Sequence, residues 1–157
     1  MKGKSIIHAG AHIRGDFQTV RIGRYCHIGE KTIIRPPSYH ASLDPNEDQI
    51  KFLPLVIGNH TRLGKDCVIE AASIGSAVYI GDGCVIQKRV IIKDCCFIEA
   101  GTVIAADTVI PPFSRVKGRP GKIVEEGFMP ESIAVTFVED CVEEFTKFLK
   151  YLEESDI

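Results

Sequence analysis

Residues 57–116 read IGNHTRLGKDCVIEAASIGSAVYIGDGCVIQKRVIIKDCCFIEAGTVIAADTVIPPFSRV, and an aliphatic residue recurs in them at a step of six. The one exception is the step of five residues from Ile69 to Ile74. The repeating residues are Ile57, Leu63, Ile69, Ile74, Ile80, Ile86, Ile92, Ile98, Ile104, Ile110 and Val116. An amphipathic helix repeats apolar residues at about 3.6 and a half-buried strand at about 2, so a period of six excludes both.

A period of six fits short flat strands that turn a corner once per hexad. Three hexads close a triangular coil, and the coils stack at about 4.8 Å with the aliphatic residues inside. Gly, Asp or Glu often follows the aliphatic residue, as in Leu63-Gly64 and Ile98-Glu99. Glycine is also expected to supply unusual dihedral angles at the turns. The fold class predicted is all-β: a single-stranded left-handed parallel β-helix of the hexapeptide type over residues 1–121, with an excursion loop at 36–55. Residues 122–157 are expected to form a linker and a C-terminal amphipathic α-helix.

A second, small or branched residue follows each aliphatic by four positions, where a corner leaves little room. These residues are Thr61, Cys67, Ser73, Val78, Cys84, Val90, Cys96, Thr102, Thr108 and Ser114. Cys26 has the same place in the N-terminal part. We therefore interpret these cysteines as small buried apolar side chains and not as a disulfide framework. No Cys-x-x-Cys pair is present, and reduced core thiols are typical of an intracellular protein.

The bulk composition excludes several classes of protein. With 157 residues of which 45% are hydrophobic, the chain suits one domain with a core. A net charge of −2 implies no general attraction to nucleic acid or to anionic membranes. No apolar run is long enough to span a bilayer, and the first residues lack the apolar region of a secretory signal. We expect no nucleic-acid partner and no direct membrane insertion.

Two irregularities interrupt the N-terminal hexads. Between Ile13 and Ile22 the chain is too long for one hexad, which predicts a longer turn. It contains Arg14-Gly15-Asp16, which we interpret as part of a coil corner and not as an integrin ligand. The repeat stops at Pro36-Pro37 and resumes at Leu55. This excursion is either a disordered insertion or a docked functional loop, and its candidate partner-binding residues are Tyr39, Ile50 and Phe52.

Apolar residues at steps of three and four predict one helix over Ser132–Glu154. Its stripe consists of Ile133, Phe137, Val138, Cys141, Val142, Phe145, Phe148, Leu149 and Leu152. The stripe either packs back along the prism or pairs with a partner subunit, and both hold if the helix is shared at an interface. The candidate partner-binding residues on it are Phe137, Phe145 and Phe148.

Hexapeptide prisms host two common chemistries, and one is zinc-dependent hydration. The segments 13–16, 22–23 and 31–34 resemble the γ-carbonic anhydrases, and by that resemblance the three zinc-binding histidines would fall at Arg35, Lys65 and Glu70. Zinc needs neutral imidazoles, and cations repel it. The five histidines, which are His8, His12, His27, His40 and His60, lie off this pattern. We therefore predict no metal site and no cofactor.

The other chemistry is acyl transfer with a histidine base. His40 lies in the excursion, but the sequence shows no supporting acid and no acceptor-recognition cluster. A solvated loop histidine is the favoured interpretation. A homotrimeric hexapeptide enzyme, either carbonic-anhydrase-like or an acyltransferase, remains the alternative function.

Several segments resemble the dynactin subunit 5 family more closely than the fold requires. They are residues 31–37 (KTIIRPP), 52–58 (FLPLVIG), 67–76 (CVIEAASIGS), 92–96 (IKDCC) and 109–113 (VIPPF). The Arg-Pro-Pro exit, the five-residue hexad and the Lys-Asp-Cys-Cys corner are the specific features, because a generic hexapeptide enzyme has no reason to share them.

The resemblance implies a cytoplasmic, cytoskeletal adaptor without enzymatic activity. It implies a place in the dynactin pointed-end complex, beside dynactin subunit 6, an actin-related protein and a zinc-containing subunit. The expected role is to help recruit cargo adaptors to dynein in microtubule-based transport. A purely structural capping module without cargo contact is a third hypothesis.

Overall fold

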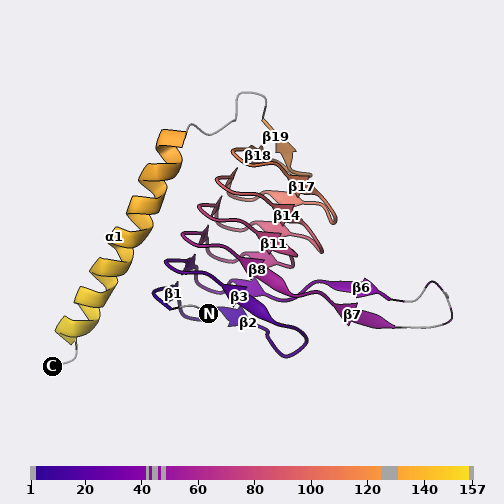
Figure 1. Cartoon of the computed structure of the whole chain (residues 1–157), viewed down its shortest axis with the longest axis horizontal. Coiled ribbons are helices and arrows are strands. Elements are labelled where there is room, and N and C mark those ends of the chain that lie inside the picture. The colour runs from indigo at the N-terminus through magenta and orange to yellow at the C-terminus, as the bar shows by residue number, and fades with distance from the viewer. Residues whose placement is uncertain (1–2, 42, 44–45, 47–48, 125–130, 156–157) are drawn as a thin grey trace.

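A computed structural model describes residues 3–41, 43, 46, 49–124 and 131–155, with helix side chains from 135 to 154. It confirms the predicted fold class: short strands wind into a left-handed parallel β-helix of about six coils, and one C-terminal helix follows (Figure 1).

Each coil contributes one strand to each of three faces. Face 1 contains the parallel strands β1 (Ile6–Ile7), β4 (His27–Ile28), β9 (Arg62–Leu63), β12 (Tyr79–Ile80), β15 (Phe97–Ile98) and β18 (Arg115–Lys117). Face 2 contains β2 (His12–Ile13), β5 (Ile33–Ile34), β10 (Val68–Ile69), β13 (Val85–Ile86) and β16 (Val103–Ile104). Face 3 contains β3 (Val20–Ile22), β8 (Leu55–Ile57), β11 (Ser73–Ile74), β14 (Ile91–Ile92) and β17 (Val109–Ile110).

The strand register places the repeated aliphatic residues in three columns inside the prism. On face 1, for example, Leu63 is paired with both Ile28 and Ile80, one coil away on either side. Every repeated aliphatic from Ile57 to Val116 is at most 2% exposed. Burial of this kind contributes about 25 cal/mol per Å2 of apolar surface, so the columns are the main source of stability.

The Thr, Ser and Cys residues at the corners are hydrogen-bond donors as well as space fillers. Thr32 Oγ1 donates to the carbonyl oxygen of Gly64 at 2.6 Å, and Cys67 Sγ donates to that of Gly81 at 3.2 Å. Both bonds join one coil to the next. The expectation that the core cysteines are merely apolar is therefore incomplete, because their thiols satisfy corner carbonyls that would otherwise be buried without a donor.

One detail of the hexad interpretation is wrong, and another holds only in part. Ser73 does not occupy a corner: in the five-residue step the buried small residue is Ala71, and Ser73 is a half-buried residue of β11. Glycine does supply left-handed dihedral angles at some turns, as at Gly83 and Gly101, but the glycines that follow the aliphatics do not have positive φ. Those glycines are needed for space: a Cβ on Gly29 would lie 2.2 Å from the carbonyl oxygen of Gly64 in the next coil.

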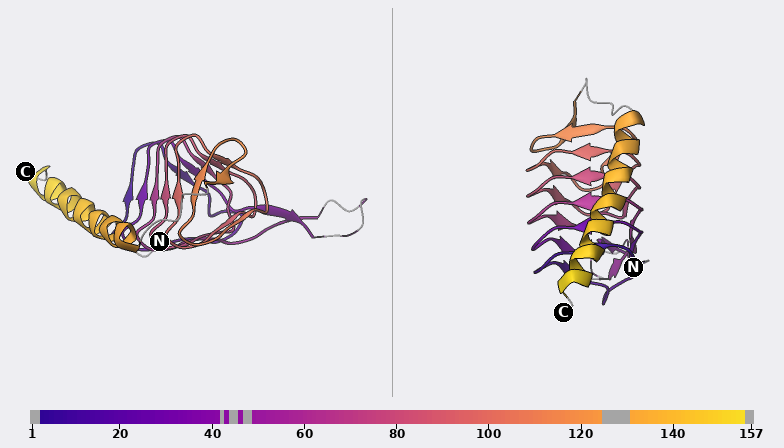
Figure 2. Two further views of the ribbon diagram at one scale, coloured as in Figure 1. Left: turned by 90° about the horizontal axis from the view of Figure 1, so that it is seen from above. Right: turned by 90° about the vertical axis from the view of Figure 1, so that its left-hand side faces the viewer.

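All variation in coil length falls at one corner, between face 2 and face 3. From aliphatic to aliphatic this corner takes nine residues in the first coil, 23 in the second, five in the third and six in the next two. The other two corners keep the step of six in every coil. The excursion of the second coil contains an antiparallel hairpin of β6 (Ser38–His40) and β7 (Ile50–Phe52). Figure 1 and Figure 2 show this hairpin projecting from the prism.

The C-terminal part closes the prism and then returns along it. Strand β19 (Lys122–Ile123) pairs antiparallel with β18, so strand pairing extends two residues past the expected boundary at 121. Helix α1 (Glu131–Ser155) lies along the prism on the side opposite the hairpin (Figure 1, Figure 2).

Helix α1 packs on the prism of its own chain, as one of the two alternatives for the apolar stripe predicted. Cys141 is buried and its Sγ lies 3.7 Å from the carbonyl oxygen of His60. Glu144 forms an ion pair with Arg62 at 2.7 Å. The side chain of Ile133, the first residue of the predicted stripe, lies outside the described residues. No helix within the described ranges is both long and apolar enough to cross a membrane.

Candidate partner-binding site

The variable corner carries a groove at the base of the hairpin, which we call the corner groove. Its volume is about 440 Å3. It is lined by Arg14, Phe17, Arg35, Pro36, Ser38, Ile50, Phe52, Glu70 and Lys88. Two surplus segments form it, the long turn of the first coil and the hairpin of the second, because both leave the prism at the same corner. The groove is therefore a product of the two irregularities that interrupt the hexads.

An aromatic contact joins these two segments. The rings of Phe17 and Phe52 stack with centroids 4.6 Å apart and an interplanar angle of 18°. The guanidinium of Arg14 lies over the Phe17 ring, 4.8 Å from its centroid. Gln18 Nε2 also donates to the carbonyl oxygen of Phe52 at 3.4 Å. Phe17 remains 52% exposed, so the hairpin is docked while apolar surface remains open to a partner.

Charged residues pair around the groove. Arg14 bonds Asp16 at 2.9 Å, and this hydrogen bond lowers the pKa of the Asp16 carboxyl. Arg89 forms two hydrogen bonds to Asp107 and donates to the backbone carbonyl of Ser38, which fixes the start of the hairpin to the fourth coil. The hairpin is thus held by contacts to two different coils.

The positions that resemble zinc ligands hold an ion pair. Arg35 Nη2 lies 3.2 Å from Glu70 Oε1, at the floor of the corner groove. Lys65 lies at a different corner, where its backbone N–H donates to Asp82. Arg35 and Lys65 are cations that would repel zinc, and Glu70 is the one residue of the three that could ligate it, so these residues do not fit a zinc site.

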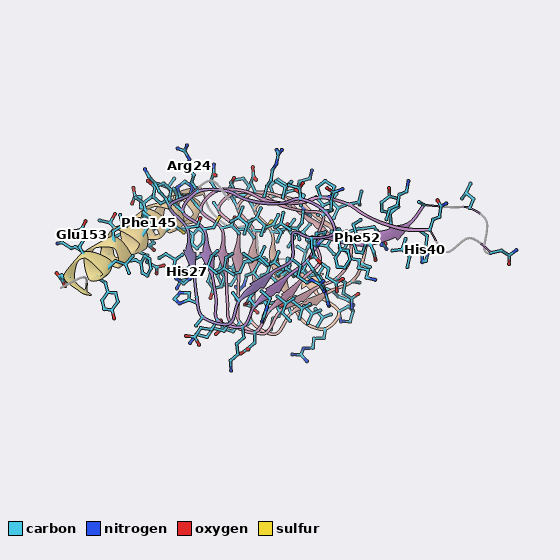
Figure 3. All side chains as sticks on the ribbon, turned by 90° about the horizontal axis from the view of Figure 1, so that it is seen from below. Arg24, His27, His40, Phe52, Phe145 and Glu153 are labelled. Carbon is cyan, nitrogen blue, oxygen red and sulfur yellow. The ribbon has the colours of Figure 1, made fainter. Side chains whose placement is uncertain are left out.

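The three hairpin candidates differ in their exposure and in their contacts. Tyr39 is half-buried, Ile50 is 55% exposed, and Phe52 is docked against Phe17 (Figure 3 labels Phe52). The structure therefore brings Ile50 and Phe52 together at the groove. Phe17 was not among the residues predicted from the sequence. The sequence did contain a signal for it, because the extra residues before Ile22 fall at the same corner as the hairpin.

The helix candidates face the prism. Phe137 contacts Tyr79 edge-on at 6.2 Å between centroids, and Phe145 contacts Tyr25 in the same way at 5.7 Å. Phe148 is half-buried. Phe137 and Phe145 thus pack within the chain, and Figure 3 shows Phe145 on the helix far from Phe52 at the hairpin.

The histidines are dispersed, apart from one pair. His12 and His40 are exposed, and Figure 3 shows His40 out on the hairpin. His60 stacks on Tyr25, and burial lowers its pKa. His27 meets His8 on the outer side of face 1. Burial, assisted by the charge of Arg62, lowers the pKa of His27 to about 4.

Known proteins resemble this chain in both sequence and fold. "Dynactin subunit 5" from Dictyostelium discoideum is 43% identical over 76 residues, which cover 48% of this chain and 36% of the relative. "Gamma carbonic anhydrase 2, mitochondrial" from Arabidopsis thaliana is 25% identical over 80% of this chain and 42% of the relative. The chain thus spans well under two thirds of either protein.

Among solved structures, a hexapeptide transferase family protein from Anaplasma phagocytophilum superposes with a TM-score of 0.59. The superposition covers 94% of this chain and 92% of that one at 17% identity, which supports the fold alone. The family model for "Dynactin subunit 5" matches residues 1–153. Because that match spans nearly all of the sequence, the chain belongs to the dynactin subunit 5 family, within the hexapeptide-repeat superfamily.

Proposed function

We propose that this chain is a non-enzymatic subunit of the dynactin pointed-end complex that supports dynein-dependent cargo recruitment in the cytoplasm. The observation that carries the proposal is the Arg35–Glu70 ion pair, at 3.2 Å, in the place where a hydration enzyme of this superfamily would hold its metal. Membership of the dynactin subunit 5 family supports the same conclusion.

The residue chemistry argues against the alternative of a hydration enzyme. A catalytic zinc needs three neutral or anionic protein ligands and an open fourth position. At the three corresponding positions the chain offers two cations and one paired carboxylate. For acyl transfer, His40 is exposed on the hairpin and is not among the residues that line the corner groove.

The corner groove is the contact surface we propose for a cargo adaptor. Rigid scaffolds commonly present binding residues on loops, and interface anchors are enriched in aromatic and arginine side chains. Phe17 and Ile50 supply exposed apolar surface, and Arg14 and Arg35 lie beside them. Tyr39 and Phe52 support this surface from the hairpin. The helix residues Phe137, Phe145 and Phe148 are proposed to reach a partner only through surface left exposed by their packing on the prism.

The test is affinity purification of the full chain from cells, with identification of co-purifying proteins. We expect dynactin subunit 6, the actin-related protein and the zinc-containing subunit to co-purify. Recovery of none of these subunits would contradict the proposal. A zinc-dependent CO2 hydration activity of the purified chain would contradict its non-enzymatic part.

A substitution separates the adaptor from a purely structural cap. Ile50→Asp places a charge on an exposed hairpin residue. Val109→Asp is the matched control, because Val109 lies on face 3 and its side chain is equally exposed. The adaptor hypothesis predicts that Ile50→Asp alone reduces cargo recruitment while dynactin assembly is kept. Intact recruitment with both variants would favour the capping module.

A further inference from the structure

A second cavity, of about 640 Å3, lies on the outer side of face 1 and away from the corner groove. His8 and His27 both line it, from neighbouring coils. Their Nε2 atoms are 3.0 Å apart, and the two rings are tilted by 59° with centroids 4.5 Å apart. Glu30, Lys65 and Asp82 line the same cavity. Neither the corner groove nor the proposed adaptor function makes use of this pair.

The separation of the two nitrogens matches a particular coordination geometry. Imidazole nitrogens bind Zn2+ at about 2.0–2.1 Å, and we take the same distance for its neighbours Cu2+ and Ni2+. Two nitrogens at right angles about such an ion lie about 2.9 Å apart, whereas tetrahedral ligands lie about 3.4 Å apart. The observed 3.0 Å is therefore the spacing of two adjacent positions in a square-planar, tetragonal or octahedral site. Cu2+ and Ni2+ favour such sites, while structural zinc is almost always tetrahedral.

We propose that His8 and His27 form a two-histidine binding site for a tetragonal divalent transition-metal ion, Cu2+ or Ni2+. These residues differ from the three positions at which the superfamily's zinc ligands would fall. Within the described part of the chain no group of three or more His, Cys, Asp or Glu side chains could hold a metal ion. Water therefore completes the coordination, and the site is a weak chelate and not a closed structural centre.

The surrounding charges permit a cation. Arg62 is paired with His27 in the strand register and would repel a metal, but Glu144 of α1 forms an ion pair with it at 2.7 Å. Glu30 and Asp82 bring two carboxylates to the cavity against the one ammonium of Lys65. The balance around the pair is thus close to neutral, apart from the ion itself.

Binding at this site would join two coils. His8 directly follows β1, and His27 belongs to β4, which is paired with β1 in the prism. A bound ion would therefore stabilise the attachment of the first coil to the second. An ion that binds only the folded chain raises its melting temperature in proportion to the logarithm of the free ion concentration.

The test uses the untagged chain and the metals themselves. Calorimetric titration with Ni2+ is expected to show one site, and Ni2+ is expected to raise the melting temperature. His8→Ala and His27→Ala should each weaken binding by about tenfold or more, since removal of one of two ligands costs at least as much as loss of an outer-sphere partner. His12→Ala and His40→Ala, which remove exposed histidines, are the matched controls and should bind like the unaltered chain.

A measurement on the unaltered chain keeps the proposal testable if a histidine variant fails to fold. The electron paramagnetic resonance spectrum of one equivalent of Cu2+ should show coupling to two imidazole nitrogens. Coupling to a single nitrogen would overturn the proposal. So would equal binding by all four variants, in which case the 3.0 Å contact is an N–H···N hydrogen bond between neutral rings.

Discussion

The prism and its two appendages are held together in different ways. Each prism coil repeats the same buried aliphatic columns, cross-coil backbone hydrogen bonds and corner donors. The hairpin is attached by an aromatic stack and a few hydrogen bonds, and helix α1 by aromatic contacts, one ion pair and one sulfur contact. Both leave large apolar residues exposed. The difference teaches that stability belongs to the repeat, while the partner contact that we propose belongs to the segments that depart from it. In a solenoid, where each coil touches only its neighbours, appendages are added without disturbing the stacking.

The largest expected effect is a glycine substitution inside the prism. In Gly29→Ala the new Cβ would meet the backbone of Gly64, with its carbonyl oxygen at 2.2 Å, so two coils must move apart. We expect a loss of about 3 kcal/mol in the free energy of unfolding, at the upper end of overpacking effects. Chemical denaturation measures this loss. Gly15→Ala is the control, since its Cβ meets nothing within 4 Å, and equal losses in both variants would contradict the close-packing explanation.

The helix should tolerate more than the prism does. Phe145→Ala removes a half-buried ring that contacts Tyr25 edge-on, and we expect a loss of about 1–2 kcal/mol. Limited proteolysis should then cleave α1 faster while the prism stays resistant. Leu149→Ala, one turn further along and 44% exposed, should change stability by less than about 0.5 kcal/mol. A loss larger than that of Gly29→Ala would contradict the division between prism and appendages.

Acid should lower the stability of the folded chain through His27. The folded chain holds the pKa of His27 at about 4, whereas an unfolded histidine has a pKa of about 6.5. The unfolded state therefore binds more protons between these values, and stability falls as the pH drops through this window. Because the ring is partly exposed, screening reduces the expected loss to about 1 kcal/mol. Thermal unfolding in EDTA at pH 7 and pH 4.5 measures it, and His27→Gln should remove that part of the pH dependence.

The smallest global effect is expected at the hairpin. Phe17→Ala removes the stacking partner of Phe52, a contact worth about 0.5–1.5 kcal/mol. We expect the global stability to change by less than about 0.5 kcal/mol, because the hairpin can open without the prism. Amide exchange at Ala41 and Leu53, whose N–H groups bond Gln49 and Pro37, should become about tenfold faster. Unchanged exchange there would show that the stack does not hold the hairpin, and Val109→Ala is the surface control.

The fold could be predicted because its cause is periodic. A step of six that persists from Ile57 to Val116 has one structural solution, and the register of the strands follows from it. The role of the glycines could not be predicted, because both a left-handed turn and a close backbone contact favour glycine, and only the stacked coils distinguish them. The position of Ser73 was predicted wrongly for a similar reason. The step from Ile69 to Ile74 is one residue shorter than the others, and the sequence does not say which position of the hexad is missing.

The candidate site could be predicted only in part. Ile50 and Phe52 stood out because they are apolar residues in a polar excursion. The stack of Phe52 on Phe17 joins residues 35 positions apart, and it depends on how far two surplus segments reach out of one corner. The pair of His8 and His27 has the same origin, since their contact comes from the stacking of coils and not from sequence spacing.

Because length variation is confined to one corner, the chain should accept insertions there without a change in its core. At that corner the second coil holds 23 residues and the third only five, yet Ile57 and Ile74 remain paired on face 3. Insertions and deletions at this corner leave the pairing of strands between coils unchanged. We expect one added residue at either other corner to shift the strands of its coil out of register. The corner between face 2 and face 3 is therefore the natural place to insert a foreign peptide or a reporter. Natural elaboration and laboratory grafting would use the same point of entry.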